Sequence, residues 1–181
     1  MPDTSAQHLI FRRYKAAYGA TIVPCFADLA GRAAGDQIVA ALGYRRARHE
    51  PLFLEAYLDE PIERVLAGVV GRDCRREEII EIGNLASDNA LAMISLWAQA
   101  ANDLGGEAEI AVAVLTAPLR SMFRRLGVKL YEIAPADPRR LGERASEWGD
   151  YYRLDPVVCA GFIADGQDRL ARVISRRSRV A

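Results

Sequence analysis

The stretch that decides the fold is "EEIIEIGNLASDNALAMISLWAQAANDLGG", residues 77–106. It begins with an apolar run typical of a β-strand, residues 79–87. A helix is predicted to follow over residues 89–104, because apolar residues recur there at helical spacing and two glycines end the run. Glu81 lies inside the strand, although burying an unpaired carboxylate costs several kcal/mol. The sequence therefore predicts either a partner or a function for Glu81.

Side chains alternate along a strand, so Glu81 is expected to share one face with Ile79, Gly83 and Leu85. Both faces are largely apolar, as in a central strand that helices cover on each side. Two interpretations of Glu81 follow: an internal salt bridge to an arginine, or a cleft carboxylate that positions or deprotonates an amine. The residues expected on the opposite face are Ile80, Ile82, Asn84 and Ala86.

Working outward, strands and helices alternate. A first helix is predicted before residue 19, a turn or short helix over "IVPCFADLAG", a strand over "QIVAALGYRRA", and a helix between Pro61 and Gly71. Downstream come a strand "AEIAVAVLT", a helix "APLRSMFRRLG", a strand "VKLYEIA", a helical or irregular segment, a last strand "PVVCAGFIA" and an arginine-rich terminal helix. This order predicts βαβ units in an α/β mixed sheet, within one domain spanning residues 1–181.

Composition narrows the function class. The 181 residues are 51% apolar and carry a formal net charge of +0, which argues against a general nucleic-acid binder. We find no secretion signal and no apolar run long enough to span a bilayer, so a cytoplasmic protein is expected. The three cysteines and two histidines form no metal-ligand cluster, and no nucleotide-binding or hydrolase motif is present.

Two further groups are candidate site residues. Ser87, at the end of the central strand, precedes a helix whose N-terminus can be capped by a side chain or can bind an anion. The cluster "EWGDYY" contains Trp148, Tyr151 and Tyr152, which line a pocket for an acyl chain or a ring, or simply pack in the core.

The order of helix, two strands, glutamate-bearing strand, helix and strand is similar to the GNAT acyltransferase fold, with splayed parallel strands flanked by helices. It resembles the acyl-homoserine-lactone synthase branch, whose central strand has a Glu-x-Ser-Arg-x-Ala pattern. Here "EIGNLAS" keeps Glu81 and Ala86 but has Gly83 and Asn84 in place of the Ser-Arg pair. The set "FLEAYLDEPIE", "EIGNLAS", "LRSMFRRLG" and "EWGDYY" with "PVVCAG" resembles the thermostable hemolysin family, over about residues 14–163.

The synthase resemblance implies roles for particular residues. Glu81 would orient or deprotonate the acceptor amine, and either Arg45 or Arg46 would contact the substrate, together with Asn84 and Tyr18. The backbone of Leu85, Ala86 and Ser87 would bind a phosphopantetheine arm, with Thr116 nearby.

The GNAT pyrophosphate loop is absent after "NLAS", where "DNALAM" stands. The resemblance therefore favours an acyl carrier protein over acyl-CoA as donor, with no permanently bound cofactor. Arg120, Arg124 and Arg125 would form a basic helix face for an acidic carrier. We expect an acyltransferase that acts on a small, amino-acid-like amine. The alternatives are a membrane-active hemolysin and a non-catalytic ligand-binding module.

Overall fold

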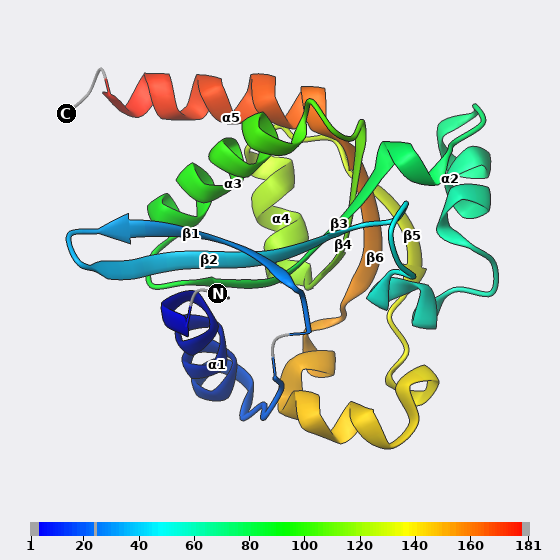
Figure 1. Ribbon diagram of the computed structural model, residues 1–181, viewed down its shortest axis with the longest axis horizontal. Helices are drawn as coiled ribbons and strands as arrows, with labels where there is room; N and C mark the ends of the chain where they lie inside the picture. The colour runs from blue at the N-terminus through cyan, green and yellow to red at the C-terminus, as the bar shows by residue number, and fades with distance from the viewer. Residues whose placement is uncertain (1–3, 24, 179–181) are drawn as a thin grey trace.

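The computed structural model describes residues 4–23 and 25–178, and its centre is a six-stranded sheet with the order β1-β2-β3-β4-β6-β5 (Figure 1). β3 and β4 are parallel, and each of the other neighbouring pairs is antiparallel. The predicted mixed sheet is thereby confirmed. The strands are β1 (Asp28–Ala34), β2 (Gln37–Arg46), β3 (Ile79–Ser87), β4 (Ile110–Leu115), β5 (Tyr131–Pro135) and β6 (Val157–Phe162).

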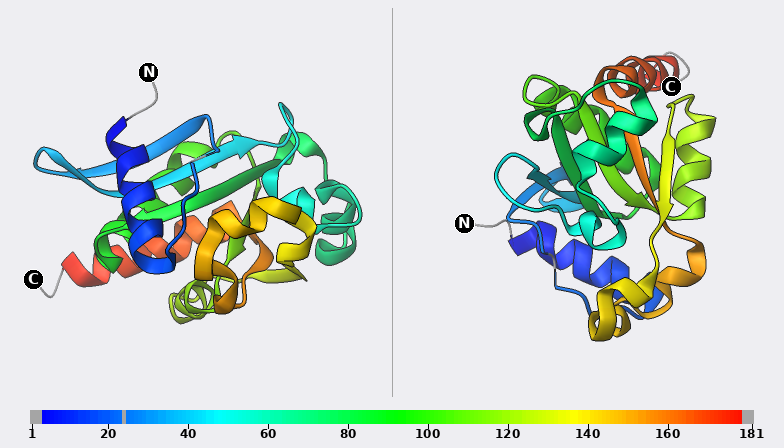
Figure 2. Two further views of the ribbon diagram at one scale, coloured as in Figure 1. Left: turned by 90° about the horizontal axis from the view of Figure 1, so that it is seen from below. Right: turned by 90° about the vertical axis from the view of Figure 1, so that its right-hand side faces the viewer.

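Helices cover both faces of this sheet. One face carries α3, α4 and α5, and the other carries α1 with the 3-10 segments η1 and η3 (Figures 1 and 2). Among the described residues, no helix is long and apolar enough to cross a membrane. The helices are α1 (Thr4–Tyr18), α2 (Ile62–Val70), α3 (Ala90–Leu104), α4 (Ala117–Arg125) and α5 (Ile163–Ser178), and the 3-10 segments are η1 (Phe53–Tyr57), η2 (Arg76–Glu78) and η3 (Pro138–Leu154).

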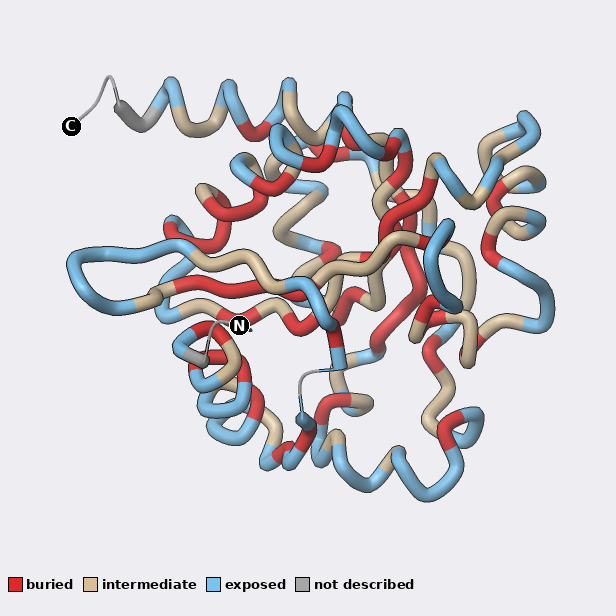
Figure 3. The backbone as a smooth tube through the Cα atoms, in the orientation of Figure 1, coloured by how far each residue is buried: buried red, intermediate tan, exposed pale blue. Residues whose placement is uncertain are grey.

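The ends of the helices follow local sequence signals. Pro61 precedes the first residue of α2, and Gly71 ends that helix in the left-handed conformation. The Asn89 side chain accepts a hydrogen bond from the Ala92 amide and so caps α3. The buried sides of α1 and α3 face the sheet (Figure 3), so the apolar stripes predicted from spacing do form the core.

β3 and β4 separate soon after they meet. Their pairing covers Ile79–Glu81 opposite Ile110–Val112, and beyond Glu81 the described β3 ladder continues only with β2. A bulge follows, because Asn84 and Leu85 together lie opposite the single residue Leu42, and Asn84 has a φ of 50°. The strands thus open a cleft beside Glu81.

The bulge corrects the alternation expected from sequence. Asn84 lines the same cavity as Glu81, whereas Leu85 packs with Ile80 and Ile82 on the α3 side. Each residue from Asn84 onward has therefore exchanged faces relative to regular alternation, because one extra residue reverses the two-residue period.

Two other expectations were wrong. Residues 28–31 belong to β1 rather than to a turn or short helix, because the antiparallel ladder with β2 overrides the weak strand preference of alanine and glycine. β5 does not pair with β4, because β6 returns antiparallel and lies between them. Within residues 25–178, β3, α3 and β4 are consequently the only strand–helix–strand unit whose parallel strands pair directly, since β6 separates the parallel strands β4 and β5.

Candidate active site

The carboxylate of Glu81 is buried, with 2% of the residue exposed, and is held by main-chain donors. The Phe53 amide donates to Oε2 at 2.8 Å and the Leu54 amide donates to Oε1 at 2.9 Å. Both donors belong to the first turn of η1, so each carboxylate oxygen has one fixed hydrogen bond. This arrangement keeps the head group in one orientation beside the opening of β3 and β4.

Burial raises the pKa of Glu81 to about 7, because removal from water disfavours the charged form. The amides of Phe53 and Leu54 and the guanidinium of Arg45 act in the opposite direction and limit that rise. Glu81 is thus poised to exchange a proton near neutral pH, which suits a general base.

The raised pKa of Glu81 predicts a pH dependence of stability. The folded state binds this proton more readily than the unfolded chain, whose glutamate pKa is near 4.5, so ionisation weakens the fold as pH rises from 4.5 towards 7. The free energy of unfolding of wild type minus that of Glu81→Gln should fall by about 3 kcal/mol between pH 4.5 and pH 8. Urea unfolding at several pH values measures it, and a flat or rising difference would contradict the assignment.

Arg45, rather than Arg46, approaches Glu81. Its Nε lies 3.5 Å from Glu81 Oε2, and its terminal nitrogens donate to the carbonyls of Cys25 and Pro51. Arg46 points elsewhere, to the carboxylates of Asp28 and Glu107. Arg45 therefore lies on the Glu81 side of the sheet and Arg46 does not, because successive residues of β2 point to opposite faces. Arg45 is not among the residues that line the cavity next to Glu81.

Phe26 packs against two glycines on neighbouring strands. Gly43 and Gly83 are register partners, and a Cβ atom on either would lie 2.6 Å from Phe26. The Arg45 guanidinium stacks over the same ring, 4.8 Å from its centroid. Glycine at both positions lets the aromatic ring lie directly on the sheet next to Glu81.

Glu81 and Asn84 open onto a cavity that we call the aromatic cavity. Tyr18, Trp148 and Tyr151, all expected near a substrate, do line it, and the centroids of Trp148 and Tyr151 are 5.1 Å apart. Tyr152 is outside the lining, and its hydroxyl instead lies 2.7 Å from the hydroxyl of Tyr57. The rings that define the cavity are Tyr14, Tyr18, Phe26, Phe53, Trp148 and Tyr151, with Tyr57 at its edge.

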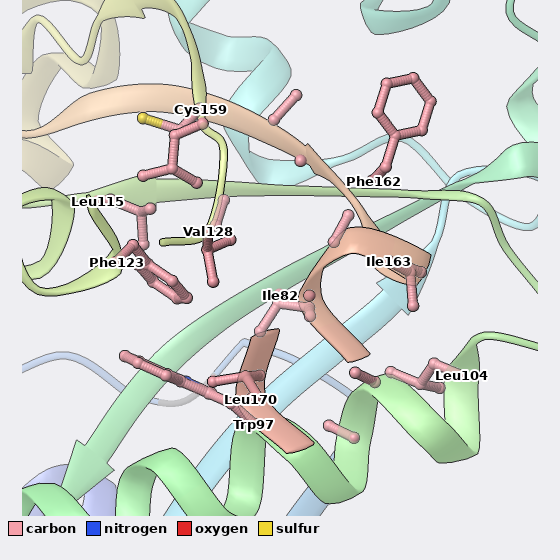
Figure 4. Close-up of a pocket in the computed structure, with 18 of the residues that line it drawn as sticks. Ile82, Trp97, Leu104, Leu115, Phe123, Val128, Cys159, Phe162, Ile163 and Leu170 are labelled. Carbon is pink, nitrogen blue, oxygen red and sulfur yellow. The ribbon is translucent and has the colours of Figure 1, made fainter. Parts of the chain in front are cut away.

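A second hollow, the apolar cavity, lies between the α3 face of the sheet and the helices above it (Figure 4). Its volume is about 110 Å³, and Figure 4 shows Ile82 of β3, Trp97 of α3, Phe123 of α4 and Leu170 of α5 directed towards it, whereas the Phe162 ring points away. Trp97 and Phe123 stack at a centroid distance of 4.2 Å at one side. The apolar cavity is defined here by Ile82, Trp97, Leu104, Leu115, Phe123 and Leu170.

A third hollow, the open groove, runs along the end of β3 between α1, α3 and α4. Leu85, Ala86 and Ser87, the predicted phosphopantetheine residues, all line it, and Arg13 of α1 faces them. Thr116 is 2% exposed at the start of α4 and lines none of these three hollows. Leu85 is common to the linings of all three.

Known proteins are similar to this chain in sequence family and in fold. A model of the family described as thermostable hemolysin matches residues 3–167. The chain belongs to the thermostable hemolysin family. No curated protein matches it.

Solved structures share the fold of this thermostable hemolysin family member. TofI in an apo form is 18% identical, with a TM-score of 0.62, over 94% of this chain and 91% of that chain. BjaI, a CoA-dependent acyl-homoserine lactone synthase with SAM and isopentyl-CoA, is 14% identical, with a TM-score of 0.61, over 94% and 81%. FeeM, an N-acyl amino acid synthase from uncultured soil microbes, is 14% identical, with a TM-score of 0.59, over 91% and 92%. This similarity of fold confirms the expected GNAT-like acyltransferase fold.

The structure corrects the predicted basic helix face for an acyl carrier protein at one residue, Arg120. Arg120 is only 6% exposed, and its guanidinium donates to the carbonyls of Leu115 and Asp155 and to the Asp155 carboxylate. It turns inward because the first turn of α4 packs over these acceptors, so it cannot contact a partner. Arg124 is exposed but pairs with Glu132, and Arg125 is exposed.

Sequence reasoning missed several residues around Glu81. The donors of Phe53 and Leu54 are main-chain groups, so no side-chain pattern marks them. The rings of Tyr14 and Phe26 were not singled out, since aromatic residues of the core and of a site look alike in sequence. The register match of Gly43 with Gly83 is a signal, but only once the pairing of β2 with β3 is known.

Proposed function

We propose that this protein transfers an acyl group from a phosphopantetheine thioester to the amine of a small acceptor. One observation carries the proposal: the buried carboxylate of Glu81 lies where β3 and β4 separate, and Leu85, further along β3, lines all three hollows. An acyl transfer needs a place for the amine, for the acyl chain and for the donor arm. The aromatic cavity, the apolar cavity and the open groove supply these in turn.

The open groove suits the donor arm. Beyond Glu81 the β4 side of β3 is free of the described β3–β4 ladder, so its peptide groups are available to the amides of a phosphopantetheine arm. The lining contains Arg13 and Asp88, and because Asp88 is paired with Arg12, Arg13 remains to favour the phosphate of that arm. Acyl carrier protein and CoA share this chemistry, and both are tested below.

The apolar cavity suits a short acyl chain. At about 110 Å³ it is smaller than the roughly 150 Å³ cavity that accepts benzene, so we expect chains of about four to six carbons. Burying such a chain stabilises the complex by roughly 0.8 kcal/mol per methylene.

The reaction follows from the position of Glu81. The amine nitrogen attacks the thioester carbonyl carbon and forms the C–N bond, while the amine proton passes to the Glu81 carboxylate directly or through water. The C–S bond then breaks, and the thiolate leaves and takes up a proton as a thiol. Holding both reactants in place provides part of the rate, and the base provides the rest.

Intact-protein mass spectrometry tests the proposal. Phosphopantetheinylated carrier protein and CoA, each loaded with chains of 4, 6, 8 or 12 carbons as a panel of lengths around the ~4–6 expected, are incubated with the enzyme and a pool of amines. Loss of acyl mass with a matching N-acyl product supports the proposal. If every thioester persists at the rate without enzyme, the binding-module or lytic interpretation replaces it.

Filling the apolar cavity should shorten the accepted chain. Ala113 of β4 lines this cavity, and Ala113→Leu should lower kcat/KM for the longest accepted chain by tenfold or more, about 1.4 kcal/mol, with little change for the shortest. Ala33→Leu, on the exposed face of β1, is the matched control and should leave the profile unchanged. Equal losses for all chain lengths would place the acyl group elsewhere.

A further inference from the structure

The aromatic cavity lacks a cation that could bind a carboxylate. Among the described residues that line it, the polar side-chain groups are the Glu81 carboxylate, the Asn84 amide, the Cys25 thiol, the Trp148 indole N–H and tyrosine hydroxyls, with no arginine, lysine or histidine. Arg45 is the nearest guanidinium to Glu81, and it is already committed to Glu81, Glu50 and two carbonyls. A second carboxylate in this cavity would therefore lie next to Glu81 without a counter-ion.

The surrounding rings favour a positive charge. The centroids of Tyr18 and Tyr151 are 5.3 Å apart, and those of Phe53 and Trp148 are 5.7 Å apart, so aromatic side chains enclose the space next to Glu81. Burial raises the pKa of Tyr14 and of Tyr151, which keeps both phenols neutral. Ring faces and a carboxylate together attract an ammonium group and repel an anion.

Asn84 adds a specific hydrogen-bond donor. The residue is 5% exposed, it lines the cavity, and its Nδ2 has no hydrogen-bond partner among the described residues. A buried donor without a partner is destabilising, and the bulge at φ 50° holds the residue at this position. A ligand oxygen that accepts from Nδ2 would remove this cost.

We propose that the acceptor is a primary amine without a free carboxylate, whose neutral carbonyl oxygen accepts a hydrogen bond from Asn84. Amines whose carboxyl group is masked as an amide or ester belong to this class, whereas free amino acids do not. The inference rests on the proposed function and narrows its acceptor. Such an acceptor is also matched to Glu81 as a base. An α-amino group beside a neutral carbonyl has a pKa of about 7.7–8.0, close to the pKa of Glu81.

Matched ligands test this inference by binding as well as by turnover. Two triads are used: leucinamide, leucine and isoamylamine, and phenylalaninamide, phenylalanine and phenethylamine. Calorimetry with the wild-type protein should show the amide binding roughly tenfold or more tightly than the acid, because the acid buries an unpaired carboxylate. The simple amine should fall between them, since it lacks the carboxamide group whose carbonyl accepts from Asn84 but carries no unpaired carboxylate.

Asn84→Gly isolates the amide contribution, because glycine keeps the positive φ without strain. In this variant the amide should lose its advantage over the simple amine, while both should still bind more tightly than the acid. Arg144 is an exposed cation whose charge acts on Tyr57 and Cys25, so Arg144→Ala serves as the control. This variant should leave the affinity order of amide, simple amine and acid unchanged.

The two proposals fail in different ways. Acids that bind as tightly as their amides in both triads, or triads in which no member binds, overturn the acceptor class. If free amino acids are acylated as fast as their amides, the acceptor class falls while the acyltransferase stands. If the amides bind selectively but no thioester is consumed, the transfer reaction falls and the recognition stands.

Discussion

Glu81→Gln should lower kcat/KM for N-acylation by roughly 10²- to 10⁴-fold, the usual contribution of a positioned general base. The amide side chain has nearly the same shape, so KM for the acyl donor should change little. The loss should appear in kcat and in a raised KM for the acceptor amine, whose ammonium group no longer faces a carboxylate. Steady-state kinetics with the best thioester from the panel measures both parameters. A variant that folds normally and acylates at the wild-type rate removes Glu81 from the mechanism.

The control is Glu77→Gln, which neutralises an exposed carboxylate just before β3 and should retain wild-type activity. The pH profile separates a base from a structural residue. Because the pKa of Glu81 is about 7, wild-type kcat/KM should rise through that pH as the carboxylate ionises. With the same acceptor, this limb should be absent in Glu81→Gln, and only the titration of the amine should remain.

Gly149→Ala should be among the most destabilising single substitutions in the chain. Gly149 has a φ of 54° and a ψ of −129°, and a Cβ there would lie 2.1 Å from the carbonyl oxygen of Tyr18. The same region is tied by the Thr21 amide, which donates to the Glu147 carbonyl at 2.8 Å. The clash therefore forces α1 away from η3, and with it two walls of the aromatic cavity.

Gly142→Ala is a matched control within η3. Its φ of 59° and ψ of −132° are nearly identical, but no atom lies within 4 Å of the added Cβ. Backbone strain alone should cost it about 1–3 kcal/mol, and Gly149→Ala should lose a further ~1–3 kcal/mol from the steric conflict. Urea unfolding measures both free energies. Equal losses would show that the contact with Tyr18 does not limit this position.

Much of the sheet and its helices was predictable, because the responsible signals are local. Apolar spacing placed α3 and β4, and Pro61, Gly71 and Pro118 marked helix ends. β1 was not predicted, since its short alanine- and glycine-rich sequence becomes a strand only through its ladder with β2. Strand order was equally hidden, because β6 lies between β4 and β5 through long-range pairing.

The site residues also fall into two groups, those marked by local sequence signals and those placed by tertiary contacts. Glu81 was predictable because an acidic residue inside an apolar strand conflicts with its surroundings, and Trp148 and Tyr151 were predictable as a cluster. The inward turn of Arg120 and the bulge at Asn84 depend on tertiary contacts that no spacing rule contains. The expected alternation of side chains along β3 failed at the bulge, because one inserted residue reverses the face of the sheet to which each later side chain points.

The main-chain hydrogen bonds to Glu81 have a consequence for how this protein can diversify. Every residue except proline keeps its main-chain N–H, so residues 53 and 54 can be exchanged for other non-proline residues without removing the donors that orient the carboxylate. Phe53 also forms part of the aromatic cavity wall. Single substitutions at position 53 would thus remodel the wall of the aromatic cavity while leaving the orientation of the Glu81 carboxylate undisturbed.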